Sequence, residues 1–175
     1  MAGSWRLCNH ESSNGNLLKE RQTMRKVFLL LVYCWVGLFG DIKLLDNDSY
    51  LSSFTYQERK DMKIGSIELV VMLEEGTAQL VDIRFKEEYE AWHMPASINI
   101  PLNELPKRLN ELDKSKVIVT ACPHKDRAIM ARTFLKLKGY NTRYLKDGLI
   151  GLAEYLRGDN AREFIQEYKK RTSIH

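Results

Sequence analysis

Apolar and polar positions change in short, regular blocks from residue 62 onward, and these blocks predict alternating strands and helices. Short apolar runs rich in β-branched residues are typical of buried strands, whereas apolar residues three and four positions apart are typical of helices. The predicted strands cover residues 62–64, 78–84, 96–101, 116–121 and 142–145. The predicted helices run from Ser66, as N-cap, to Gly76 and over 85–93, 103–112, 127–138, 148–156 and 159–171.

This alternation predicts an α/β fold, with a central parallel sheet covered by helices on both faces in three layers. The stretch at 116–121, KVIVTA, is the most continuous apolar and β-branched run, which is typical of a central parallel strand. Ligands of such sheets bind beyond the carboxyl ends of the strands. Cys122 directly follows this strand and is therefore the first candidate for a functional residue.

The domain boundaries follow from where the pattern begins and ends. We predict the globular domain over 62–158 and a C-terminal helix within 159–175. Residues 41–61 mix polar and apolar residues without a clear period, which indicates a linker.

An apolar run over 27–39, preceded by basic residues, predicts a targeting segment. It is too short to cross a bilayer of about 30 Å as a helix, but its length and basic flank are typical of a secretory signal peptide. We interpret 24–40 as a cleaved signal or an uncleaved membrane anchor, which predicts export to the periplasm or membrane attachment through 27–39. A buried core helix in a cytoplasmic protein is the alternative. Residues 1–23 are predicted to be a disordered polar extension, and Met24 is the expected natural start.

The charge balance argues against nucleic acid as a partner. The 27 Lys and Arg residues and 23 Asp and Glu residues leave a net charge of +4, and residues 1–40 hold five basic against two acidic side chains. The remainder is therefore nearly neutral, whereas a nucleic-acid interface needs a basic face. The three cysteines, Cys8, Cys34 and Cys122, lie far apart without a Cys-x-x-Cys pair, so they predict neither a disulfide framework nor a zinc site.

The six residues from Cys122 to Arg127 form a strand-to-helix loop that suits thiol chemistry. A free thiol has a pKa of about 8.5, and cations or a helix N-terminus lower it. A loop that curls into a helix turns its backbone N–H groups inward, and the helix dipole adds positive charge at the same point. We therefore expect Cys122 to be held as a thiolate. Asp126 is predicted to face outward, where it would help to begin the helix.

Cys122 could also have one of two non-catalytic roles. An unreactive cysteine buried at the end of a strand is common. A metal site built on Cys122 and His124 has no further ligands at useful spacing, so no metal is expected.

Two blocks of residues resemble the rhodanese-like domain family over about 62–157. The first block contains Asp-x-Arg, Glu-Tyr, His-x-Pro and Asn-Ile-Pro motifs, and the second contains a strand, a Cys-x4-Arg loop, a helix, Gly-Tyr and Leu-x-x-Gly. The matching positions are Asp82, Arg84, Glu88, Tyr89, His93, Pro95, Asn99, Ile100, Pro101, Cys122, Arg127, Gly139, Tyr140, Leu145 and Gly148.

The resemblance implies a sulfurtransferase that needs no metal or organic cofactor. Cys122 would take a sulfur atom from thiosulfate or a polysulfide, hold it as a persulfide and pass it to a thiol or to cyanide. Small sulfur anions and thiols would then be its partners. Arg127 would close the loop or contact the anion. Substrate contacts would come from Pro123, His124, Lys125 and Asp126, and a structural network from Asp82, Arg84 and His93.

Departures from the family pattern leave two alternatives open. Lys125 stands where the family often has glycine, so its backbone is expected to be left-handed and the substrate to differ. A non-catalytic rhodanese module for binding or regulation is one alternative. A phosphatase or arsenate reductase of the same fold is the other alternative. Enzymes of that kind have a Cys-x5-Arg loop, which is one residue longer than the Cys-x4-Arg loop of this chain.

Overall fold

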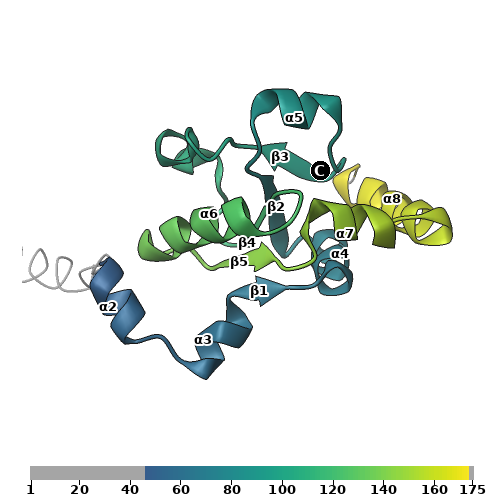
Figure 1. Cartoon of the computed structure of the whole chain (residues 1–175). Coiled ribbons are helices and arrows are strands. Elements are labelled where there is room, and N and C mark those ends of the chain that lie inside the picture. Colours follow the sequence, from purple (N-terminus) through teal and green to yellow (C-terminus); the bar gives the residue numbers. More distant parts are fainter. Residues whose placement is uncertain (1–45, 174–175) are drawn as a thin grey trace, which may run out of the picture. The chain divides into compact units, whose positions relative to one another are not determined.

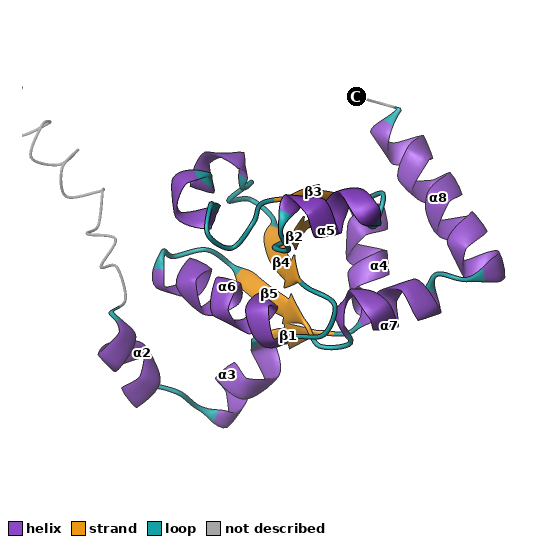
Figure 2. Cartoon of the chain, turned by 45° about the horizontal axis from the view of Figure 1, so that its top comes forward, coloured by secondary structure: helices purple, strands orange, loops and turns teal. Residues whose placement is uncertain are grey.

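The computed structural model describes residues 46–173, which form a parallel five-stranded sheet with helices on both faces (Figures 1 and 2). The strands are β1 Lys63–Ile64, β2 Ala78–Asp82, β3 Ser97–Asn99, β4 Val117–Ala121 and β5 Thr142–Leu145, in the spatial order β1-β5-β4-β2-β3. The helices are α2 Asn47–Ser52, α3 Tyr56–Asp61, α4 Ser66–Glu75, α5 Lys86–Ala91, α6 Asp126–Leu137, α7 Gly148–Tyr155 and α8 Gly158–Thr172. The predicted three-layer α/β fold is confirmed.

Strand β4 lies in the middle of the sheet because both of its faces carry apolar side chains. Val119 and Ala121 pack on one side with α4, α7 and α8, while Ile118 packs on the other side with α6. Strand β2 pairs along its full length with β4, and β5 pairs on the opposite edge. Because every strand runs in the same direction, Cys122 after β4 and Asp82 at the end of β2 reach the same edge of the sheet.

The start of α4 differs from the prediction, whereas its end agrees with it. Gly65 is the N-cap and Ser66 is the first helical residue. The N–H and hydroxyl groups of Ser66 both donate to Asp147, at 2.8 and 3.0 Å, so a carboxylate 81 residues further along the chain caps this helix. Gly76 ends the helix in the left-handed conformation (φ 76°) that glycine adopts without steric cost.

The helix predicted over 103–112 is wrong. Two separate 3-10 turns, Leu105–Lys107 and Leu109–Glu111, occupy this segment. Pro106 has no N–H to donate, which prevents a continuous α-helix through this position. The predicted apolar side is nevertheless turned inward, because Leu105 and Leu112 are buried.

The described part of the range 41–61, predicted as a linker, folds into two helices. Asp46 caps α2 by accepting from the N–H of Ser49 at 2.9 Å, and Thr55 caps α3 by accepting from the N–H of Glu58 at 3.1 Å. These capping pairs form locally and do not depend on an apolar period, which is why the hydrophobic pattern missed them. Tyr50 on α2 is buried against the domain.

The C-terminal helix α8 packs on α4 through Phe164, whose side chain is buried with the core residues of that helix. No helix between residues 46 and 173 is long and apolar enough to span a membrane. The predictions for 1–23, for 24–40 and for the first residues of 41–61 lie outside the described residues.

Candidate active site

Cys122 begins a tight loop whose carbonyl groups are held by the start of α7. The N–H of Leu149 donates to the carbonyl oxygen of Cys122 at 2.8 Å, and the N–H of Ile150 donates to that of Pro123 at 3.3 Å. Because these carbonyls point toward α7, the N–H groups on the other side of the loop can point toward the sulfur. Figure 1 shows the loop between β4 and α6 next to the start of α7.

Gly148 makes this close packing possible. Its φ of 65° is left-handed, and a Cβ placed on it would lie 2.2 Å from the carbonyl oxygen of Pro123 and 2.3 Å from that of His124. Real Cβ atoms do not approach oxygen so closely, so only glycine fits against the loop. Gly148 is the glycine of the Leu-x-x-Gly motif, and its role was not predicted from the sequence.

The backbone N–H groups of His124, Arg127 and Ala128 point at the sulfur of Cys122 and each lowers the pKa of the thiol. This is the inward-facing arrangement that the sequence predicts for a strand-to-helix loop.

The prediction of a resting thiolate is wrong. Burial raises the pKa of Cys122 above its ordinary value, the Asp126 carboxylate raises it further, and the three N–H groups only partly offset these effects. The residue is completely buried, so its charged form loses its hydration. These effects favour the protonated thiol over the predicted thiolate.

Asp126 is exposed at the first position of α6, as predicted, but its side chain also contacts the sulfur, which was not predicted. The thiol donates to Oδ1 of Asp126 across 3.6 Å. The backbone N–H of Arg127 is the main cause of a lowered pKa of Asp126, so this carboxyl is ionised at neutral pH. An acid four residues after the cysteine, at the first position of α6, reaches back over the loop, and that spacing was the signal available in the sequence.

Arg127 closes the loop onto α5. Its guanidinium group pairs with both carboxylate oxygens of Glu88, at 2.7 and 2.9 Å. Glu88 also accepts from the N–H of Phe85 at 3.2 Å, and the pair with Arg127 is the main cause of the lowered pKa of Glu88. Of the two roles predicted for Arg127, this geometry matches loop closure.

We expect Glu88→Gln to slow sulfur loading of Cys122 about three- to tenfold and to lower the free energy of unfolding by about 1 kcal/mol, as for a half-exposed ion pair. Arg127→Met should behave alike, because each change removes the same contact. Single-turnover loading followed by mass spectrometry measures the rate. A much larger loss in Arg127→Met than in Glu88→Gln would show that Arg127 also contacts the donor.

The other loop residues lie at the rim of the site. Pro123 is half-buried, whereas His124 and Lys125 are exposed. Lys125 is the N-cap of α6 with φ −157°, and the described residues contain no left-handed residue other than glycine. The predicted left-handed backbone at Lys125 is therefore wrong.

Asp82 and Arg84 form a buried pair close to the loop. The Arg84 guanidinium donates to both oxygens of Asp82, at 2.7 to 3.0 Å, and to the carbonyl of Trp92 at 2.6 Å. The guanidinium also lies 4.2 Å from the ring centre of Trp92. His93 is apart from this pair: it is exposed, stacks on Tyr89 and approaches the Tyr89 carbonyl at 3.0 Å. The structure thus joins two of the three residues predicted as one network.

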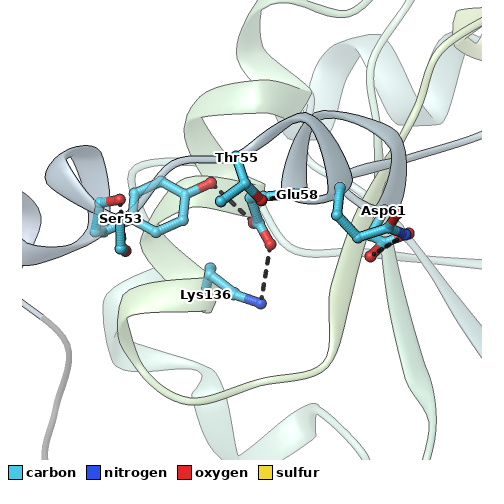
Figure 3. A pocket seen from close by; sticks show the side chains of 7 residues that line it. Ser53, Thr55, Glu58, Asp61 and Lys136 are labelled. Atoms are coloured by element: carbon cyan, nitrogen blue, oxygen red, sulfur yellow. Dashed lines mark hydrogen bonds and ion pairs between the residues drawn. The ribbon is translucent and has the colours of Figure 1, made fainter.

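A separate cavity of about 230 Å³ lies between α2, α3 and the far end of α6 (Figure 3). Its lining residues are Tyr50, Ser53, Thr55, Gln57, Glu58, Asp61 and Lys136. Lys136 and Asp126 lie at opposite ends of α6, about 15 Å apart along a helix that rises about 1.5 Å per residue. The cavity is therefore distinct from the thiol loop.

Residues 46–173 contain no group of three or more His, Cys, Asp or Glu side chains that could hold a metal ion. The loop instead offers one thiol, one carboxylate and a set of N–H donors.

Comparison with known proteins identifies the family and the fold. The family model of the rhodanese-like domain matches residues 67–154, which include the loop. A thiosulfate sulfurtransferase, GlpE of Pseudomonas syringae, is 30% identical over 76 residues, covering 43% of this chain and 72% of that protein. The solved structure of the BH2092 protein from Bacillus halodurans is 26% identical, with a TM-score of 0.52, and the match covers 62% of this chain and 80% of that one. The chain belongs to the rhodanese-like domain family.

Several curated relatives are much longer than the matched region. A putative sulfur carrier protein of Bacillus subtilis, YrkF, is 39% identical over 61 residues, which are 35% of this chain and 33% of that protein. A transcriptional regulator of Mycobacterium tuberculosis is 49% identical over 55 residues, or 31% of this chain and 24% of that protein. The chain therefore spans a third or less of the length of these relatives.

Proposed function

We propose that this protein is a sulfurtransferase that carries a sulfane sulfur as a persulfide on Cys122. The observation that carries the proposal is the convergence of three backbone N–H groups on the sulfur, which favours negative charge there. The relatives named as a thiosulfate sulfurtransferase and a putative sulfur carrier support the same class of reaction.

The proposed reaction has two steps. The Cys122 sulfur attacks the outer sulfur of a donor, such as thiosulfate or a polysulfide, and the remainder of the donor leaves. A thiol or cyanide then attacks the outer sulfur of the Cys122 persulfide and regenerates the thiol. The covalent intermediate divides one difficult transfer into two easier ones. The N–H groups of His124, Arg127 and Ala128 stabilise the negative charge on sulfur in both steps.

The test is the mass of the full-length protein after incubation with thiosulfate or with polysulfide. We expect a gain of about 32 Da, one sulfur atom, located on the peptide that contains Cys122. Cys122→Ser should not gain this mass at that peptide, and peptide mapping separates it from sulfur on Cys8 or Cys34. Loading of Cys8 or Cys34 alone would contradict the proposal.

The raised pKa of Cys122 predicts how its reactivity depends on pH. Because the thiolate is the nucleophile, alkylation by iodoacetamide should quicken about tenfold per pH unit from about pH 7 to about pH 9, without a plateau. Quenched samples analysed by peptide mapping give the rate at Cys122. A plateau at neutral pH would mean that the N–H groups outweigh burial and Asp126.

A non-catalytic module is the second candidate, and the site offers one observation in its favour. The thiol is fully buried and bonded to Asp126, which opposes its ionisation. The mass experiment separates the two functions, because a binding module would leave Cys122 unloaded with every donor while its fold stays intact.

A further inference from the structure

The Cys122 loop places the Asp126 carboxylate beside the reacting sulfur, and among residues 46–173 no cationic side chain forms an ion pair with this carboxylate, although the charge of Arg127 acts on it. Oδ1 of Asp126 is 3.6 Å from the sulfur. Arg127, the basic residue next to Asp126 in the chain, forms its ion pair with Glu88 instead. Lys125 and His124 are exposed at the rim.

The other charged groups near the loop are also committed elsewhere. On β2 and the segment after it, Asp82 and Arg84 neutralise each other. At the start of α7, Asp147 accepts two hydrogen bonds from Ser66. Asp126 is therefore the charged side chain in contact with the sulfur, and it is compensated by the Arg127 charge and by the backbone N–H of Arg127 without an ion pair.

We propose that Asp126 determines the sulfur donor, so that the site takes organic persulfides, R–S–SH, in preference to the thiosulfate dianion. This inference rests on the proposed function. A dianion that brings its outer sulfur to Cys122 must approach the exposed Asp126 carboxylate, and like charges a few ångströms apart repel each other even where solvent screens them in part. An organic persulfide carries at most one negative charge on its sulfurs, and none when it is protonated, so it meets less repulsion than the dianion.

The carboxylate also gives the thiol proton a route. As the Cys122 sulfur bonds to the outer sulfur of R–S–SH, the bond between the two donor sulfurs breaks and its electron pair leaves with R–S. Asp126 accepts the Cys122 proton and passes it to the leaving sulfur. The products are R–SH and the Cys122 persulfide, Cys122–S–SH. Atoms, charge and electrons balance, and the carboxylate is restored.

The experiment compares kcat/KM for thiosulfate and for 2-hydroxyethyl persulfide in the full-length protein. Wild type should prefer the persulfide by about 100-fold. Asp126→Asn should raise kcat/KM for thiosulfate about tenfold, because the repulsion is gone, and lower it for the persulfide about tenfold, because the proton route is gone. A merely structural role would lower both values together.

Two further variants serve as a control and as a substitute for Asp126→Asn. Glu87→Gln removes an exposed carboxylate on α5 that has no contact with Cys122, and its donor ratio should match wild type. Asp126→Ser also removes the charge while keeping a side chain favoured at helix starts, so it serves if the asparagine variant does not fold. Thermal unfolding establishes that each variant is folded.

The outcomes distinguish this inference from the proposed function. Sulfur loading of wild type with an equal preference for both donors, or an unchanged donor ratio in both Asp126 variants, would overturn the role of Asp126 and leave the sulfurtransferase standing. Failure of wild type to load Cys122 from either donor would overturn both.

Discussion

Replacing Gly148 by alanine is expected to stop sulfur loading of Cys122 and to destabilise the domain. The new Cβ would lie 2.2 and 2.3 Å from two carbonyl oxygens of the loop, at Pro123 and His124, and the φ of 65° would strain an L-residue. The backbone must shift to relieve the overlap. We expect a loss of about 3 kcal/mol in the free energy of unfolding, from about 1–2 kcal/mol of backbone strain plus overpacking. Denaturant unfolding measures this loss.

Sulfur loading should fall at least about 100-fold, since the same shift moves the N–H groups away from the sulfur. Gly158→Ala is the matched control: Gly158 also begins a helix with a positive φ, of 56°, but a Cβ there meets no atom within 4 Å. It should cost about 1 kcal/mol of backbone strain and leave loading unchanged. Equal behaviour of the two variants would refute the packing argument.

Replacing Arg132 by methionine is expected to cost about 3 kcal/mol of stability without a direct effect on the thiol. Arg132 on α6 is 1% exposed and donates to the hydroxyl of Tyr50 and to the carboxylate of Glu58. Methionine fills similar space but leaves Glu58 with Lys136, 3.5 Å away, as its remaining ion-pair partner. Figure 3 shows Lys136 directed at Glu58 from the α6 side. Urea unfolding at neutral pH measures the loss.

The Glu58 pair also predicts a dependence on pH. Burial opposes ionisation of Glu58, but hydrogen bonds from Arg132 and Tyr50 and the charges of Arg132 and Lys136 outweigh it and lower its pKa below 4.5. Wild type should therefore keep the stabilisation above about pH 4.5 and lose it as the pH falls through the lowered folded-state pKa. Arg132→Met should lose less over this range. In a double-mutant cycle with Glu58→Gln, a coupling energy near zero would refute the pairing.

The elements predicted correctly from the sequence are those whose residue types follow from burial or from local backbone conformation. Strand β4 was identified because a strand covered on both faces needs apolar residues at consecutive positions, and Gly76 was identified because a helix end in the left-handed conformation favours glycine. The loop after β4 was predicted in the same way, since its N–H groups must turn inward wherever a strand leads directly into a helix. These features depend on neighbours in the chain.

The predictions failed where partners are distant in sequence or where two effects compete. Glu88 lies 39 residues from Arg127, and Glu58 lies 74 residues from Arg132, so no local pattern joins them. The protonation of Cys122 depends on the balance between burial and N–H donors, and composition does not reveal how fully the sulfur is covered. The contact of Asp126 with the sulfur likewise follows from the loop geometry.

The loop is tied to α7 through main-chain atoms alone, by the bonds from Leu149 and Ile150 to the carbonyls of Cys122 and Pro123. Side chains at positions 124–126 therefore take no part in this anchoring. The three residues at the tip of the loop can therefore be exchanged as a unit. Another tripeptide between Pro123 and Arg127 should alter the reactivity of Cys122 while the rest of the fold stays the same. A library randomised at those three codons offers an engineering route to new sulfur-handling catalysts.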